Sequence, residues 1–143
     1  MQNYPNAIVT VVGHSLGGAL ALLDGVLIRM LASPSTNVGV VTYGMPRIGN
    51  QAFASFVDAI LPGSVKHVNN MRDPYPIVPA IPLGYHQVMG EIHIQEHTGQ
   101  WVSCPEEDNA DSRCIVGTVN SISDARFSDH DGPYNGIMLS CSS

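Results

Sequence analysis

Short β-branched runs alternate along this chain with longer segments rich in Leu and Ala. Residues 7–12 form a continuous apolar run that ends at Gly13, which is typical of a strand buried on both faces. Residues 16–31 are apolar on nearly every side and predict a helix packed deep against a sheet. Further strands are predicted at residues 38–43, 64–69 and 88–94, and a second helix at residues 50–61. Because strands separated by helices pair in parallel, the sequence predicts an α/β fold with a mostly parallel sheet.

Length and charge limit what such a chain can do. The 143 residues suffice for one domain, and we expect residues 1–143 to belong to a single one. Twelve acidic against six basic residues leave a net charge of −6, so the chain has no basic patch for nucleic acid. Its longest apolar segment carries Asp24 and Arg29 and is shorter than the roughly 20 clean residues of a transmembrane helix, so none is predicted. The first residues have neither the basic nor the apolar region of a secretion signal.

The three cysteines point to an oxidising compartment. Cys104 and Cys114 bracket a polar loop that a short disulfide would close, with a stabilisation of about 2.7 kcal/mol. Cys141 is then left over, which suggests a partner outside this sequence. Three free thiols are the alternative. A zinc site at the first two cysteines is disfavoured because no second ligand pair accompanies them.

Between the first predicted strand and helix lies the sequence Gly13-His14-Ser15-Leu16-Gly17, a G-x-S-x-G motif. This context predicts a sharp elbow that exposes Ser15 as a nucleophile at the carboxyl end of the sheet. A Cβ at Gly13 or Gly17 would collide as the chain reverses, and Ser15 is expected at a rarely populated φ/ψ. The N–H of Leu16, at the helix N-terminus, is the candidate oxyanion donor. His14 is expected to point away from Ser15 and to serve in packing, and the alternative for the motif is a turn with an N-capping serine.

Together with this motif, several segments resemble the fungal class 3 triacylglycerol lipases of the α/β-hydrolase fold. The resemblance is carried by Tyr4-Pro5, residues 8–21, 42–50 and 70–74, Val78-Pro79 and residues 84–86. It runs from about residue 4 to residue 136 and covers only the carboxyl-terminal half of the family's domain. It implies a mostly parallel central sheet with helices on both faces, here without the family's N-terminal strands and lid. It also implies a serine esterase that acts on acylglycerols at a lipid–water interface, with a triad in the order serine, aspartate, histidine.

The missing lid, the missing signal and the odd Cys141 lead us to expect that this chain is part of a longer, secreted protein. The triad chemistry requires no cofactor and no metal ion. In the family, the earlier half of the domain supplies the second oxyanion donor.

A general base and a carboxylate must lie at the same end of the sheet as the serine. Asp73 follows the strand predicted at residues 64–69 and lies in a loop stiffened by prolines. Spacing alone leaves four histidines as the base: His86, His93, His97 and His130. The loop at residues 128–134 resembles the family's histidine loop, which selects His130 as the base, and the resemblance makes His86 a scaffold residue.

The sequence from His93 to His97 also matches H-x-x-E-H, a zinc metallopeptidase pattern in which both histidines and Glu96 share one helix face. Residues 88–94 alternate like a strand near the sheet edge, with Ile92 and Ile94 on one face. We therefore expect no zinc site here.

The leading function is acyl-ester hydrolysis by Ser15, His130 and Asp73. Two alternatives remain open at this point. One is a feruloyl-type or other soluble-ester esterase on the same scaffold, because the acyl groove and lid that select the substrate are hardly represented. The other is an inactive α/β-hydrolase relative with a binding role.

Overall fold

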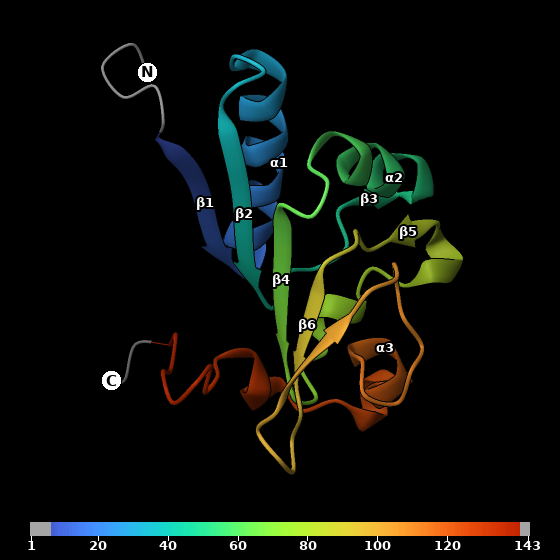
Figure 1. Cartoon of the computed structure of the whole chain (residues 1–143). Coiled ribbons are helices and arrows are strands. Elements are labelled where there is room, and N and C mark those ends of the chain that lie inside the picture. Colours follow the sequence, from blue (N-terminus) through green and yellow to red (C-terminus); the bar gives the residue numbers. More distant parts are fainter. Residues whose placement is uncertain (1–6, 141–143) are drawn as a thin grey trace.

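A computed structural model of the chain describes residues 7–140 (Figure 1). Its main strands are β1 (Ile8–His14), β2 (Asn37–Tyr43), β4 (Val65–Asn70), β6 (Glu91–Ile94) and β7 (Trp101–Cys104), and a small pair is formed by β3 (Gly49–Asn50) and β5 (Tyr85–His86). The helices are α1 (Leu16–Leu31), α2 (Gln51–Ile60) and α3 (Ile115–Thr118), with 3₁₀ turns at Tyr75–Ile77, Ile81–Leu83, Ile122–Asp124 and Phe127–His130. The main sheet has the order β1-β2-β4-β6-β7, parallel from β1 to β6 and antiparallel between β6 and β7. The predicted α/β fold with a mostly parallel sheet is confirmed.

The predicted elements agree closely with the observed ones where the sequence pattern is long. The helix at residues 16–31 is α1 itself, and the strands β1, β2 and β4 differ from their predicted bounds by at most two residues. The strand predicted at 88–94 is shorter, because Gly90 has a φ of 103° and its backbone closely approaches the carbonyl group of Val65. The short strands β3, β5 and β7 were not predicted.

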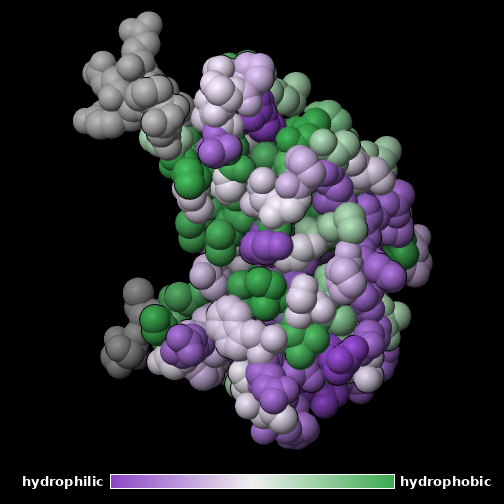
Figure 2. Space-filling view, viewed as in Figure 1, coloured by the Kyte–Doolittle hydropathy of each residue, from purple (hydrophilic) through white to green (hydrophobic). Residues whose placement is uncertain are grey.

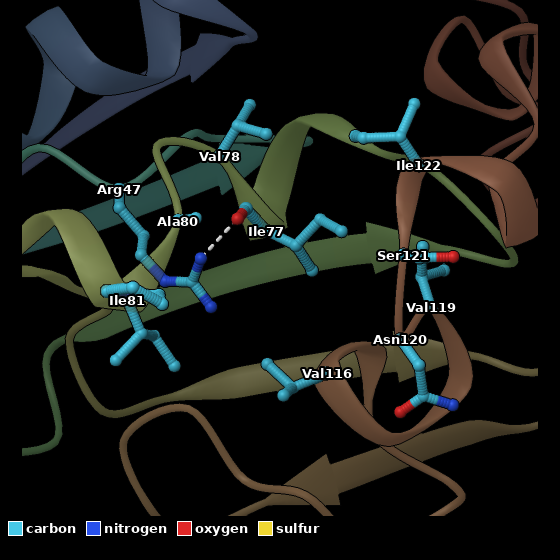
Figure 3. Close-up of a pocket in the computed structure, with 11 residues that line it drawn as sticks. Arg47, Ile77, Val78, Ala80, Ile81, Val116, Val119, Asn120, Ser121 and Ile122 are labelled. Carbon is cyan, nitrogen blue, oxygen red and sulfur yellow. Dashed lines mark hydrogen bonds between the residues drawn. The ribbon is translucent and has the colours of Figure 1, made fainter.

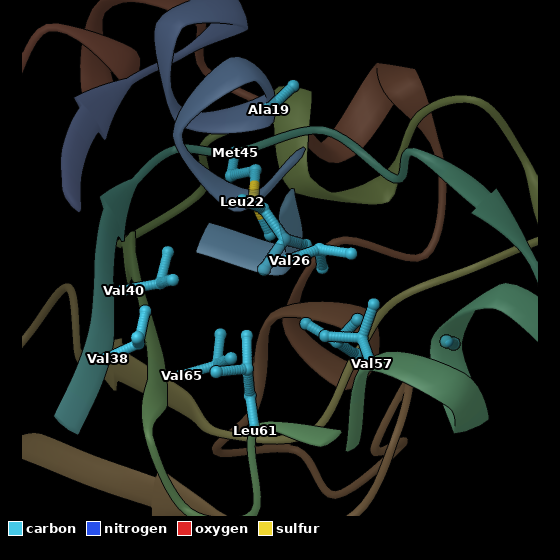
Figure 4. Packing of buried hydrophobic residues seen from close by; sticks show 11 residues of the cluster. Ala19, Leu22, Val26, Val38, Val40, Met45, Val57, Leu61 and Val65 are labelled. Carbon is cyan, nitrogen blue, oxygen red and sulfur yellow. The ribbon is translucent and has the colours of Figure 1, made fainter. Parts of the chain in front are cut away.

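The main hydrophobic core lies between one face of the sheet and helices α1 and α2 (Figure 4). Leu22 of α1 and Val57 of α2 are fully buried there against Val40 of β2 and Val65 of β4. At Gly25 an added Cβ would overlap the Val40 side chain, so the absence of a side chain lets α1 lie close to the sheet. This packing sets the direction in which α1 leaves the elbow.

The C-terminal segment packs on part of the opposite face of the sheet. Tyr134 packs there with Val68 and Ile94, and Tyr43 and Ile92 pack against this cluster. Ile92 and Ile94 share this face as predicted. In residues 7–140 this second face has no counterpart to α1 and α2, because both long helices contribute to the core on the first face.

The expectation that the first strand is buried on both faces is wrong for the described residues. Strand β1 lies at the sheet edge, and Ile8 and Val12 are 68% and 60% exposed. Helix α1 is likewise buried along one side only, with Leu20 and Leu27 more than half exposed. Figure 2 shows hydrophobic side chains along the edge where β1 lies, above a hollow in the molecular outline. In residues 7–140 no element packs over these side chains, and this explains the difference.

Cys104 and Cys114 form a disulfide that joins the end of β7 to the start of α3. Cys141 and Tyr4-Pro5 lie outside the described residues. None of the helices in residues 7–140 has both the length and the hydropathy needed to cross a bilayer.

Candidate active site

The turn between β1 and α1 consists of Ser15 alone. Strand β1 ends at His14 and α1 begins at Leu16, so the chain must reverse at this one residue. Ser15 has a φ of 56° and a ψ of −129°. A residue with a side chain is strained at such a φ and persists there only when its surroundings hold it. The Ser15 N–H donates to the carbonyl oxygen of Tyr43 at 2.8 Å, which ties the elbow to the end of β2. Because Leu16 is the first residue of α1, its N–H has no partner within the helix.

The glycines around Ser15 differ in what they do. A Cβ at Gly13 would overlap the backbone of Gly17, as expected. At Gly18 a Cβ would lie 3.2 Å from the Cβ atoms of Thr42 and Met45, so this glycine lets the helix approach β2. The expectation for Gly17 is wrong, because a Cβ there would meet nothing within 4 Å. The chain reversal brings the position of a Gly13 Cβ against the backbone of Gly17. The position of a Gly17 Cβ points away from Gly13 into open space.

Three side chains from distant parts of the chain form one hydrogen-bonded line. The Nε2 atom of His130 lies 2.7 Å from the Oγ of Ser15, and its Nδ1 lies 2.9 Å from the Oδ2 of Asp73. Asp73 is fully buried and His130 is 8% exposed. Elbow, aspartate loop and histidine loop thus meet at the carboxyl ends of the parallel strands.

Burial raises the pKa of Asp73, and hydrogen bonds from His130 and from the Tyr75 N–H oppose that rise because they stabilise the carboxylate. The Tyr75 N–H donates to the Asp73 Oδ1 at 2.9 Å. The second carboxylate oxygen therefore remains for the imidazole N–H. In the neutral imidazole, an Nδ1–H bonded to Asp73 leaves Nε2 to accept the hydroxyl hydrogen of Ser15.

The side chain of His14 contacts His130. Its Nε2 lies 2.8 Å from the carbonyl oxygen of His130, and the two rings are 4.5 Å apart. The Tyr134 hydroxyl donates to the same carbonyl oxygen at 3.2 Å, and burial raises the pKa of Tyr134. His14 thus packs on the histidine loop, which agrees with a packing role in place of a second base.

Three further contacts join the aspartate and histidine loops, and none is evident from the sequence. Asn70 Nδ2 donates to the carbonyl oxygen of Asp129 at 2.9 Å, and the Arg72 N–H donates to its carboxylate at 3.1 Å. The Arg126 N–H also donates to the carbonyl oxygen of Arg72 at 2.8 Å. Arg72 and Asp129, the sequence neighbours of Asp73 and His130, are therefore hydrogen-bonded to each other.

Gly44, directly after β2, is another residue that the sequence analysis did not single out. It has a φ of 56°, and an added Cβ would lie 2.7 Å from the Asp73 Oδ2 and 2.8 Å from the His130 Nδ1. A glycine after a predicted central strand was the available signal. Gly44 leaves the space in which the carboxylate and the imidazole meet.

The other candidate histidines lie elsewhere. His86 is 3.3 Å from the Asp108 carboxylate. His93 is buried in β6 with its ring nitrogens 2.7 and 2.8 Å from the carbonyl oxygens of Arg113 and Met71.

The His97 side chain is 90% exposed, and Glu96 pairs with Arg126 at 2.8 Å. The residues of the H-x-x-E-H pattern therefore lie on a strand and a turn, not on one face of a helix.

One group of metal-binding residue types occurs within residues 7–140, namely Glu91, Cys104 and Cys114. The two sulfur atoms are bonded to each other. The Glu91 carboxylate accepts a hydrogen bond from the Ile115 N–H at 2.7 Å, and burial raises its pKa. These groups stabilise the start of α3.

With this geometry established, comparison with known proteins places the chain in a family. The model of the family described as Lipase (class 3) matches residues 1–83, more than half of the chain. The chain belongs to the class 3 lipase family. A secreted mono- and diacylglycerol lipase 3 of Gibberella zeae is 32% identical over 139 residues, which are 94% of this chain and 44% of that protein.

Solved structures of lipases agree with the fold. A lipase from Rhizopus microsporus var. chinensis superposes with a TM-score of 0.76 at 33% identity, over 96% of this chain and 46% of that one. A triacylglycerol lipase whose catalytic centre is described as a serine protease triad gives a TM-score of 0.77 at 30% identity, over 96% of this chain and 51% of that one. The neighbours support the α/β-hydrolase assignment, and the chain spans about half the length of the lipases that it matches.

Proposed function

We propose that the protein containing this chain is a serine ester hydrolase that releases fatty acids from acylglycerols. The observation that carries the proposal is the hydrogen-bonded line from Ser15 through His130 to buried Asp73. Membership of the class 3 lipase family supports it independently. The family's curated members, such as the Gibberella zeae protein, include lipases of mono- and diacylglycerols.

In this mechanism the Ser15 Oγ attacks the ester carbonyl carbon while His130 Nε2 takes the hydroxyl proton. The Leu16 N–H donates to the oxyanion that forms. The proton then passes from His130 to the leaving alcohol, and an acyl-enzyme remains on Ser15. Water attacks the acyl-enzyme with His130 again as the base, which releases the acid and restores the serine. Asp73 keeps the imidazole in the required tautomer and stabilises the imidazolium.

The surroundings of Ser15 favour an apolar acyl group. Leu16 is 70% exposed and Phe127 is 60% exposed, and both residues belong to elements that carry the site. The ring of Tyr75 is stacked on His130 at 3.9 Å and meets Phe127 edge-on at 6.3 Å. An aromatic acyl group would also suit this pair, so a feruloyl-type esterase is the second candidate.

An extracellular location belongs to the same proposal. The disulfide between Cys104 and Cys114 persists in an oxidising environment, and the Gibberella zeae relative is named as secreted.

The decisive test uses a fluorophosphonate probe on the longest natural form of the protein that contains this chain. We expect one equivalent of probe on Ser15, found by peptide mass spectrometry, and none in the Ser15→Ala variant. The absence of labelling in folded wild-type protein would identify an inactive relative. Rates on emulsified triolein, dissolved butyrate ester and methyl ferulate then separate lipase from esterase, and we expect triolein to be hydrolysed fastest.

A further inference from the structure

One arginine holds the segment that follows Asp73. Arg47 lies in the loop after β2, and its side chain is 2% exposed. Its backbone N–H donates to the carbonyl oxygen of Val78 at 2.9 Å. Its guanidinium donates to the carbonyl oxygen of Ile77 (Figure 3) and also to that of Pro79. Three successive carbonyl groups of the segment are therefore bound by one residue.

Asp108 holds this arginine in turn. Its Oδ1 accepts a hydrogen bond from the Arg47 Nε at 2.8 Å and forms an ion pair with Nη2 at 2.7 Å, and its side chain is 8% exposed. Its Oδ2 accepts from the Gln87 N–H at 3.0 Å and lies 3.3 Å from Nδ1 of His86. Asp108 lies in the loop closed by the disulfide between β7 and α3. The ion pair is therefore buried, and removing one partner would leave an unpaired buried charge.

Packing beneath the held segment is incomplete. A pocket of about 300 Å³ separates residues 77–82 from residues 116–122, and Arg47, Ile77 and Ile122 are among the side chains that line it (Figure 3). Side chains that border this open pocket have no protein neighbour on that side. The position of the segment therefore depends strongly on the bonds from Arg47.

The same segment contacts two members of the triad. The Tyr75 N–H donates to the Asp73 Oδ1 at 2.9 Å, and the Tyr75 ring lies 3.9 Å from the ring of His130. A shift of the segment would change the orientation of both the carboxylate and the imidazole.

We propose that Arg47 and Asp108 are positioning residues for the triad, which they set by fixing residues 75–79 against the pocket. The inference rests on the proposed ester hydrolysis and adds two residues that contact neither Ser15 nor His130 directly. It also assigns a task to the segment around Arg47, one of those that carry the family resemblance.

The test compares Asp108→Ala with Asp111→Ala in the longest natural form of the protein. Asp111 lies in the same disulfide-closed loop, and its pair with Arg113 is exposed. We expect kcat on a dissolved ester, per probe-titrated serine, to fall about 10- to 100-fold in Asp108→Ala with KM within about twofold. The proton NMR resonance of the His130 Nδ1–H should shift or broaden in the same variant. Asp111→Ala should change neither quantity.

A folded Asp108→Ala protein with wild-type kcat and an unchanged imidazole resonance would overturn the proposal. If circular dichroism shows that this variant does not fold, Asp108→Asn is measured in its place, and the same outcomes apply. Failure of the proposed function has a different signature, in which wild-type protein neither hydrolyses the ester nor reacts with the probe. The resonance comparison then still decides whether Asp108 positions His130.

Discussion

Replacing Gly44 with alanine would place a methyl group inside the contact between Asp73 and His130. The new Cβ would lie 2.7 Å from the Asp73 Oδ2, 2.8 Å from the His130 Nδ1 and 2.9 Å from its Cε1. Ordinary van der Waals contact of a Cβ begins at about 3.4 Å, so the pair must move by about 0.7 Å. Since a misplacement of about 1 Å can cost about 10²-fold in rate, we expect kcat to fall about 30- to 100-fold. Because alanine is strained at a φ of 56°, the substitution should also lower the free energy of unfolding by about 1–2 kcal/mol.

Gly63→Ala is the matched control, because it separates the backbone cost from the collision. Gly63 has a φ of 68°, and a Cβ there would meet nothing within 4 Å. We expect the same loss of about 1–2 kcal/mol in urea unfolding but wild-type kcat on a dissolved ester, with active sites counted by probe titration. A folded Gly44→Ala protein with kcat within about twofold of wild type would refute the steric reasoning. Equal loss of activity in Gly63→Ala would show that strain alone is responsible.

Three other predictions concern a buried histidine, the disulfide and the exposed edge of β1. Desolvation lowers the pKa of buried His67 from 6.5 to about 4. As the pH falls through this range, His67 is protonated in the unfolded chain but not in the folded chain, so the folded state loses stability. Urea unfolding should show wild-type protein losing up to about 3 kcal/mol more than His67→Gln between about pH 7 and pH 4, and parallel curves would contradict this. Replacing both Cys104 and Cys114 with alanine should lower the free energy of unfolding by about 2–3 kcal/mol in urea titrations, whereas no change would mean that the loop needs no closure. Expressed alone, residues 1–143 should self-associate through the exposed edge of β1 and hydrolyse little ester, and a monomer in sedimentation with full activity would disprove that.

Much of the fold was predictable because its signals are local. Residues 16–31 have the composition of a buried helix, and α1 has these bounds. The strand, Gly13 and Ser15 are adjacent in the sequence, so the G-x-S-x-G motif and its context were enough to predict the elbow. The strands β3 and β5 have two residues each, too few for a period to show. The exposure of β1 was missed because an apolar run does not reveal which neighbours are present to cover it.

The chain's own residues thus determined the sheet, the elbow and Ser15, since steric and hydrophobic signals between neighbours in sequence are sufficient for these. Spacing left four histidines open, and only the family resemblance selected His130. Only the tertiary structure showed which imidazole lies 2.7 Å from Ser15. It also showed that a side chain at position 44 would collide with Asp73 and His130, and that Asp108 binds Arg47 across 61 positions of sequence. These contacts join loops whose relative positions depend on the packing of the whole domain, and no local pattern encodes that packing.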